Sequence, residues 1–255
     1  MTCFVDTHCH FDFDPFCGTE EESLRLAAEA GVEKIIAVGV SADRFASVLA
    51  LAEKYAPVYA ALGTHPMAIA QHQEAHLQQL EDLLRQRPLK LIAIGEIGLD
   101  LYIENPQFDK QQAVLETQLR LAMRYDLPVI LHSRRTHDKL AMQLRRLDAR
   151  GVVHGFAGSE QQALAFVREG FAIGVGGTIT YERASKTRNA IARLPLTSLL
   201  LETDSPDMPV QGFQGQPNRP ERIKNVWQSL CEIREESPQE IAETIRENTR
   251  KLFRI

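Results

Sequence analysis

Six side chains that could bind a metal ion follow short apolar runs at widely separated places in the chain. They are His8, His10, Glu96, His132, His154 and Asp204. Imidazole nitrogens and carboxylate oxygens are common ligands of divalent metals. Burying so many of these groups without partners would be costly, and a bound cation would remove that cost. The pattern therefore predicts a metal site.

The sharpest local signal is the His8-Cys9-His10 triplet. Residues two apart on a strand point the same way, with Cα atoms about 6.5 Å apart, so two imidazoles at this spacing can reach one ion. Cys9 between them would face the opposite side, and we expect it to pack in the core rather than bind metal.

The number of candidate ligands favours two ions. Six ligands exceed the needs of one tetrahedral zinc, and Glu96 is the natural bridge because its strand lies between strands one and five. We expect one ion to take His8, His10 and Asp204, and the other to take His132 and His154. Two-metal sites hold both the attacking and the leaving oxygen, which favours hydrolysis.

Four residues near these ligands have expected roles in catalysis or binding. Asp204, a ligand and a carboxylate, is the candidate catalytic residue that accepts or orients the proton of the attacking water. We expect Glu202 to orient a ligand or a water, and His65 and Arg134 to support a ligand or contact the substrate.

The remaining histidines favour structural roles. His72 and His76 lie one helical turn apart, which predicts an exposed helix surface, and His137 is expected at a solvated helix start.

Short β-branched runs alternate with longer helical patterns along the whole chain. We expect strands at 3–7, 34–39, 58–62, 91–95, 128–132, 151–154, 171–175 and 198–203. We expect helices near 20–30, 43–55, 75–86, 109–125, 136–148, 160–169, 183–193, 219–236 and 238–253.

Eight strand–helix units without a linker predict an α/β fold, a single (β/α)₈ TIM-type barrel over residues 1–255 with an extra C-terminal helix. Strands that are apolar throughout, such as 129–131 and 199–201, are typical of a parallel sheet covered by helices. An open doubly wound sheet is the alternative, but no glycine-rich nucleotide loop is present. In such barrels the active site lies at the carboxyl ends of the strands, where the candidate ligands stand.

Net charge and the distribution of apolar residues limit the binding partners and the cellular location that we expect. The net charge of −5 argues against a protein that coats long duplexes. No signal peptide or apolar run long enough to span a membrane is evident, so we expect a cytoplasmic protein without membrane contact. No feature indicates an obligate protein partner. The proline-rich stretch 206–220 is either a functional loop or an exposed excursion.

Beyond these patterns, the sequence resembles the TatD-type metal-dependent deoxyribonucleases over its whole length. The resemblance rests on VDTHCHF (5–11), GTHP (63–66), GEIGLD (95–100), LPVILHSR (127–134), GVVHGFAGS (151–159) and LLLETDSP (199–206). It implies a barrel with a dinuclear site held by the same six ligands. It also implies a magnesium-dependent DNase activity, which includes the removal of nucleotides from 3′ ends.

The departures from the family pattern lie in the loops that follow the strands, which form the rim where a substrate is expected to bind. Arg135 stands where the family often has Asp, and Gly155 and Ala157 replace Cys and Ser. Asp207-Met208 follow ETDSP where many members have an aromatic residue or Leu. The run 216–220 keeps only Asn and Pro of a common Lys-Arg-Asn-Glu-Pro segment. None of these positions is a candidate ligand, so the departures concern the choice of substrate.

Three functions can be weighed on this basis. The first is a phosphodiesterase acting on DNA ends or a small phosphorylated substrate, which basic residues after strand five, such as Arg134, Arg135 and Lys139, would support. The alternative is a zinc-type amidohydrolase or lactonase, which Glu96 disfavours because many such barrels use a carboxylated Lys bridge. A catalytically dead binding protein would lack ligands, and none is missing. The metal ions could be zinc, manganese or magnesium, since imidazoles favour the first two.

Overall fold

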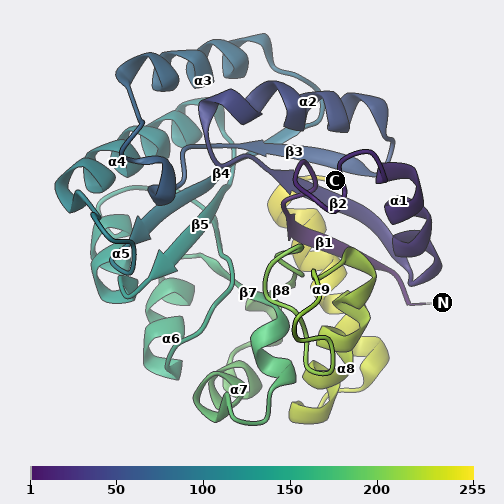
Figure 1. The fold of residues 1–255 in the computed structure, drawn as a ribbon. Coiled ribbons are helices and arrows are strands. Elements are labelled where there is room, and N and C mark those ends of the chain that lie inside the picture. Colours follow the sequence, from purple (N-terminus) through teal and green to yellow (C-terminus); the bar gives the residue numbers. More distant parts are fainter. Residues whose placement is uncertain (1) are drawn as a thin grey trace.

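Eight parallel strands in consecutive order form one sheet that curls into a nearly closed barrel (Figure 1). The computed structural model describes residues 2–255. The strands are β1 (Phe4–Cys9), β2 (Val32–Val38), β3 (Val58–Leu62), β4 (Leu91–Asp100), β5 (Val129–Arg134), β6 (Gly151–Val153), β7 (Ala172–Val175) and β8 (Leu199–Leu201). The predicted barrel is confirmed, and the open sheet is not.

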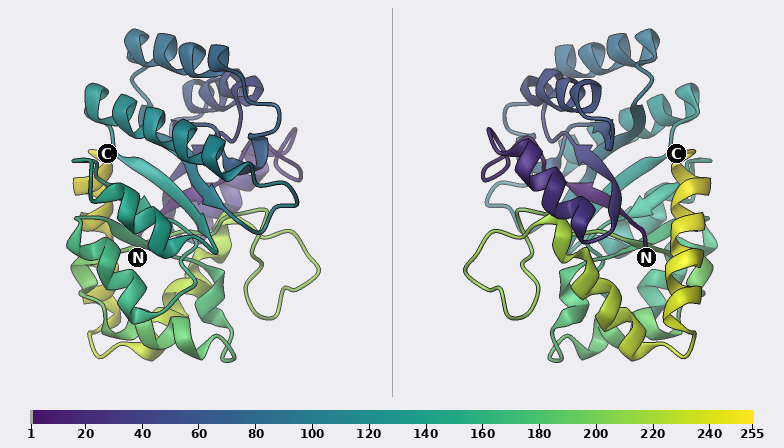
Figure 2. Two further views of the ribbon diagram at one scale, coloured as in Figure 1. Left: turned by 90° about the vertical axis from the view of Figure 1, so that its left-hand side faces the viewer. Right: turned by 90° about the vertical axis from the view of Figure 1, so that its right-hand side faces the viewer.

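Helices surround the strands, and one further helix follows the eighth strand–helix unit (Figures 1 and 2). They are α1 (Glu20–Glu29), α2 (Phe45–Lys54), α3 (Glu74–Gln86), α4 (Phe108–Tyr125), α5 (His137–Leu144), α6 (Glu160–Arg168), α7 (Ser185–Arg193), α8 (Ile223–Ile233) and α9 (Pro238–Phe253). Short 3₁₀ turns span Ala42–Arg44, Pro66–Ala68, Gly177–Thr180, Leu196–Ser198 and Pro220–Arg222. The extra C-terminal helix expected from the sequence is α9. None of the helices within residues 2–255 is both long and apolar enough to cross a membrane.

The barrel closes where the end of β1 meets the segment after β8. The backbone N–H of His10 donates to the carbonyl of Ser205 at 2.8 Å, and that of Asp204 donates to the carbonyl of His8 at 2.9 Å. A parallel bridge joins Cys9 to Ser205. Closure therefore places both histidines of the first strand beside the carboxylate that follows the last.

The alternation of side chains along the strands aims polar residues at one end of the barrel. Ile130, Val152 and Leu200 lie in one buried cluster, against which Phe253 packs. Two positions later on the same strands or directly after them stand His132, His154 and Glu202. Because alternate residues of a strand share a face, an apolar interior continues directly into a polar mouth at the carboxyl ends.

Two element boundaries differ from the sequence-based expectation in ways that affect the site. β4 runs to Asp100, five residues past the expected end, because its pairing with β5 continues through Gly98–His132 and Asp100–Arg134. The buried side chain of Gln111 supports this extension by accepting from the N–H of Asp100 at 2.8 Å and donating to its carbonyl at 2.9 Å. α8 begins at Ile223, four residues later than expected.

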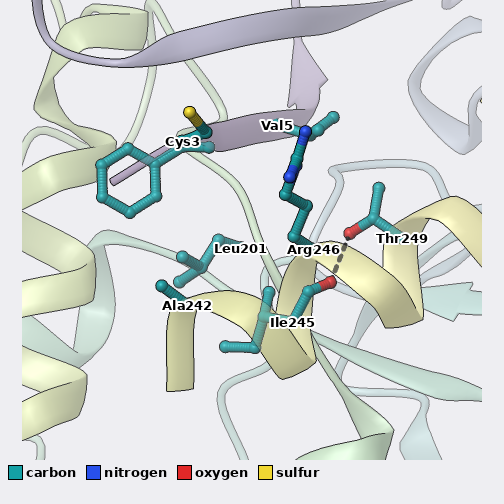
Figure 3. Close-up of a pocket in the computed structure, with 8 residues that line it drawn as sticks. Cys3, Val5, Leu201, Ala242, Ile245, Arg246 and Thr249 are labelled. Atoms are coloured by element: carbon teal, nitrogen blue, oxygen red, sulfur yellow. Dashed lines mark hydrogen bonds between the residues drawn. The ribbon is translucent and has the colours of Figure 1, made fainter. Parts of the chain in front are cut away.

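The proline-rich segment after β8 extends away from the barrel (Figure 2). Its base is held by buried Asn218, whose amide donates to the carbonyls of Thr203 at 2.8 Å and Met208 at 3.1 Å. At the opposite end of the barrel, residues of β1, β8 and α9 line a small cavity (Figure 3). Its volume is about 10 Å³, room for no more than a water molecule, so it is not a substrate site.

Candidate metal centre

The carboxylate of Glu96 stands at the centre of the polar mouth and faces two different sets of histidines. Its Oε2 lies 3.2 Å from Nε2 of His8 and 3.6 Å from Nε2 of His10. Its Oε1 lies 2.7 Å from Nε2 of His154 and 3.1 Å from Nδ1 of His132. One carboxylate thus touches every histidine predicted as a ligand, with a separate oxygen for each set.

Asp204 completes the set around His8 and His10. Its Oδ1 lies 3.4 Å from Nε2 of His8 and 3.3 Å from Nε2 of His10. The backbone of Asp204 is left-handed, with φ of 58°, a conformation that aspartate tolerates better than most residues. The structure therefore brings together all six residues proposed as ligands.

His65 joins the second set more closely than the sequence suggested. Its Nε2 lies 3.2 Å from Oε1 of Glu96, and its ring lies 4.3 Å from that of His132, centroid to centroid. His65, Glu96 and His132 could together hold an ion, as could His8, His10 and Glu96. The Nδ1 of His65 accepts from the N–H of Met67 at 3.0 Å, which fixes the ring.

The chemistry of these side chains fits a bound cation. His8 is completely buried, and neither of its ring nitrogens makes a hydrogen bond to a described residue, although Nε2 lies within 3.4 Å of two carboxylates. Its ring stacks on that of His154 at 3.8 Å. Buried polar atoms without partners are rare in folded proteins and call for an explanation. A metal ion bound by Nε2 of His8 would explain why this nitrogen has no hydrogen-bond partner.

The charges of the cluster compensate one another. Burial favours the neutral form of Glu96, but His154 and the other imidazoles outweigh it and hold the pKa of this carboxyl well below its ordinary value. Burial lowers the pKa of His8. Burial also acts to lower the pKa of His10, but its contact with Asp204 prevails and raises that pKa to about 9. Divalent ions would take over the role of these protons, because metal ligation requires neutral imidazole.

A carboxylate that the sequence analysis did not single out orients His132. Asp100, at the end of β4, lies with Oδ2 2.9 Å from Nε2 of His132, while Nδ1 of the same ring faces Glu96. A histidine held by a carboxylate on one nitrogen presents the other to a metal. The sequence contains a signal for Asp100, because Glu96, Gly98 and Asp100 are two positions apart. Residues at that spacing share one face of a strand that extends to Asp100.

Glu202 takes a comparable position behind His154. Its side chain is completely buried, Oε1 accepts from the backbone N–H of Gly155, and the same oxygen lies 3.7 Å from Nδ1 of His154. Its Oε2 makes no hydrogen bond to a described residue. A side chain at Gly174 would collide with this carboxylate, so the glycine leaves room for it.

The other sequence-based expectations have mixed outcomes. His72 does not lie on an exposed helix surface, because it is buried in the turn before α3. His137 begins α5 but is half-buried, with Nδ1 3.1 Å from the hydroxyl of Ser133. Cys9 packs in the core as expected. Arg134 is exposed at the end of β5, where its guanidinium lies over Tyr102 rather than in the histidine cluster.

The family to which the chain is similar is consistent with a metal centre at this place. The family model described as "TatD related DNase" matches residues 5–254. The chain belongs to the TatD-related DNase family. Its relatives include a metal-dependent hydrolase and a deoxyribonuclease, and this chain is a metal-dependent hydrolase.

Three relatives place the chain within the TatD-related family. An uncharacterized metal-dependent hydrolase, YjjV of Escherichia coli K12, is 62% identical with full coverage of both chains. The crystal structure of YjjV superposes with a TM-score of 0.98 at 61% identity, again over 100% of each chain. The 3′-5′ ssDNA/RNA exonuclease TatD of Yersinia pseudotuberculosis is 32% identical over 94% of this chain and 95% of its own. Human deoxyribonuclease TATDN3 is 31% identical over 98% and 94%.

Proposed function

We propose that this protein is a phosphodiesterase that acts on DNA ends through two divalent metal ions. The observation that carries the proposal is the position of Glu96, whose two carboxylate oxygens face separate groups of histidines. A carboxylate in this position can bridge two ions. His8, His10 and Asp204 would hold one ion, and His132 and His154 the other. His65 stands close enough to support the second group.

The residues of the chain divide the work of hydrolysis. When bound, the two ions would polarise the phosphoryl oxygen and stabilise the departing oxygen. Asp204 would orient the attacking water and accept its proton, because it is a carboxylate at the open edge of the cluster. Asp100 would hold the ring of His132 in place from behind, and the carboxylate of Glu202 lies 3.7 Å from Nδ1 of His154.

The donor set favours some metals over others. Several imidazoles around two carboxylates suit zinc or manganese, whereas magnesium prefers oxygen ligands. Magnesium stays a candidate because the family resemblance implies it. The tightly bound ions and the ions that support turnover need not be the same.

The names of relatives support DNA as the substrate. One relative is a single-stranded DNA and RNA exonuclease, and another is a deoxyribonuclease. The chain departs from the family at rim positions such as Arg135 and Arg219. We therefore expect its preference among DNA ends and small phosphorylated substrates to differ from that of other members.

An activity screen of the metal-loaded protein tests this proposal. Single-stranded DNA, RNA, a small phosphodiester, a lactone and an amide would each be incubated with protein loaded with zinc, manganese or magnesium. We expect cleavage of phosphodiesters that stops when a chelator removes the metal. Cleavage of the amide or lactone alone would favour the amidohydrolase alternative.

Asp204→Asn tests the assigned proton acceptor. The substitution keeps the shape of the side chain but removes its charge, so we expect turnover to fall about 10²–10⁴-fold without loss of the fold. Asp148→Asn, at an exposed position in the segment that precedes β6, is the matched control and should behave as wild type. A variant at position 204 that kept more than about a tenth of wild-type turnover would rule out the general-base role.

A further inference from the structure

Two consecutive arginines gather over one aromatic ring beside the metal centre. The guanidinium carbon of Arg134 lies 3.6 Å from the centre of the Tyr102 ring, and that of Arg135 lies 4.6 Å from it. Neighbouring residues of a strand normally point to opposite sides. The left-handed backbone of Arg135, with φ of 60°, ends β5 and allows both side chains to reach the same ring. We call Tyr102, Arg134 and Arg135 the arginine platform.

The hydrogen-bond donors of the arginine platform are free. Within residues 2–255, neither guanidinium forms an ion pair or a side-chain hydrogen bond. Other arginines are neutralised, such as Arg44 by Asp12 at 2.8 Å and Arg234 by Glu236 at 2.6 Å. Stacking on a ring fixes the plane of a guanidinium without using its N–H groups. The platform therefore presents two oriented cations to an anion.

The arginine platform lies next to the candidate metal centre and shares β5 and Asp100 with it. Arg134 follows His132 by two positions on β5, so its side chain leaves the same face about 6.5 Å further along the strand. The N–H of Tyr102 donates to Oδ1 of Asp100 at 2.7 Å, and Oδ2 of Asp100 contacts His132. One carboxylate thus links the platform to a candidate metal ligand.

A second cation–aromatic pair joins the two helices next to β4 and β5. The ammonium of Lys139 in α5 lies 5.3 Å from the ring centre of Phe108 in α4. In the described part of the chain, Lys139 also has no acidic partner. Figure 1 shows α4 and α5 side by side next to β4 and β5. Cations interleaved with aromatic rings are typical of surfaces that bind single-stranded nucleic acid.

We propose that the arginine platform, extended by Phe108 and Lys139, binds the phosphates of a single nucleic-acid strand that flank the bond to be cleaved. This inference rests on the proposed function, since it places the strand with its reacting phosphate at the metal centre. Guanidinium groups match phosphate with two parallel N–H bonds, and a row of cations suits an anion that repeats along a backbone.

Binding of a labelled strand to the full-length protein tests the platform without relying on turnover. Fluorescence anisotropy would give the Kd of fluorescein-labelled hexathymidylate in the presence of a chelator, which prevents cleavage, over a series of KCl concentrations. We expect Arg134→Gln and Arg135→Gln each to raise Kd about tenfold. The slope of log Kd against log salt should fall by about 0.7 for each lost phosphate contact.

Variants of Tyr102 separate positioning from charge. Tyr102→Leu removes the ring that orients both guanidinium groups, so we expect weaker binding while the charges remain. Tyr102→Phe keeps the ring and should restore the wild-type Kd. Arg168→Gln, at an exposed and unpaired position on the last turn of α6, is the matched control and should change nothing. Circular dichroism and Tm would confirm that each variant is folded.

Three results would overturn the proposal. They are an unchanged Kd and salt slope in both arginine variants, an equal loss in Arg168→Gln, and displacement of the strand by inorganic phosphate at its own Kd. The last result would indicate a small phosphorylated ligand. Wild-type protein that shows the expected Kd pattern but does not cleave the strand when loaded with metal would support the platform and contradict the proposed function.

Discussion

Asp100 shows how a residue outside the ligand set can control a metal site. Its carboxylate contacts one nitrogen of His132 at 2.9 Å and accepts from the N–H of Tyr102 at 2.7 Å, while Gln111 holds the backbone of Asp100. The ring of His132 can then turn only its other nitrogen to Glu96. The hydrogen bond to Asp100 also increases the basicity of the imidazole, which strengthens a bond to metal.

We predict that Asp100→Asn weakens metal binding about 10–100-fold without unfolding the protein. The amide cannot accept from the His132 ring as a charged carboxylate does. Isothermal titration of metal-free protein with zinc or manganese would measure the change in Kd. Asp109→Asn, at an exposed position in α4, serves as the control. Equal affinities for wild type and Asp100→Asn would show that Asp100 does not position His132.

At the residue scale, the sequence predicted which candidate ligands come together better than it predicted the residues that support them. The spacing of His8 and His10 and the place of Asp204 after the last strand follow from strand geometry alone. Asp100 was missed because the fourth strand was expected to end at residue 95, whereas its pairing with β5 continues to Asp100. The burial of His72 could not be foreseen either, since helical spacing does not show which residues precede the helix.

Among the elements, α4 has a direct influence on the centre through buried glutamines. Gln118 is completely buried, and its side chain accepts from the N–H of Thr64 at 2.7 Å and donates to its carbonyl at 3.3 Å. Thr64 immediately precedes His65, so the helix fixes the loop that carries this histidine. Gln111 does the same for Asp100.

We predict that Gln118→Ala lowers the free energy of unfolding by about 2–4 kcal/mol. The substitution leaves a cavity and removes the partners of both backbone groups of Thr64. Urea denaturation monitored by circular dichroism would measure the loss. Gln78→Ala, on an exposed face of α3, should change stability by no more than about 0.5 kcal/mol. Similar losses in the two variants would contradict a specific role for the buried amide.

The existence of most elements, but not all their ends, could be predicted from periodicity. The strand 58–62 matches β3 at both ends, because β-branched and small apolar residues stop at Gly63. The eighth strand was expected over 198–203, yet β8 ends at Leu201. The next residues turn toward β1, and Thr203 donates its backbone N–H to the carboxylate of buried Asp6 at 2.9 Å. Such a contact across nearly 200 positions leaves no local signal.

At the scale of the whole molecule, the two ends of the barrel differ in the side chains that they carry. The carboxyl ends of the strands carry the histidines and carboxylates, while α9 covers the other end. Phe253 of α9 is buried against side chains from inside the barrel, including Ile36 and Leu200. The apolar packing of α9 against this end is therefore separate from the candidate metal centre.

We predict that Phe253→Ala lowers the free energy of unfolding by about 3–5 kcal/mol while metal affinity in the folded protein stays unchanged. Removal of the ring leaves a cavity at the base of the barrel, remote from Glu96. Chemical denaturation and metal titration would measure the two properties separately. Met142→Ala, at a half-exposed position in α5, is the control with little expected effect. A large loss of metal affinity in Phe253→Ala would show that the two ends are coupled.

The central claim is that Glu96 bridges two metal ions, and metal stoichiometry tests it most directly. Wild type and Glu96→Gln would be dialysed to equilibrium against zinc or manganese and their metal content measured by elemental analysis. We predict about two equivalents per chain in wild type and about one or fewer in Glu96→Gln, because the amide cannot bridge as a charged carboxylate does. About one equivalent or less in wild type, or full retention of metal by Glu96→Gln, would contradict the claim.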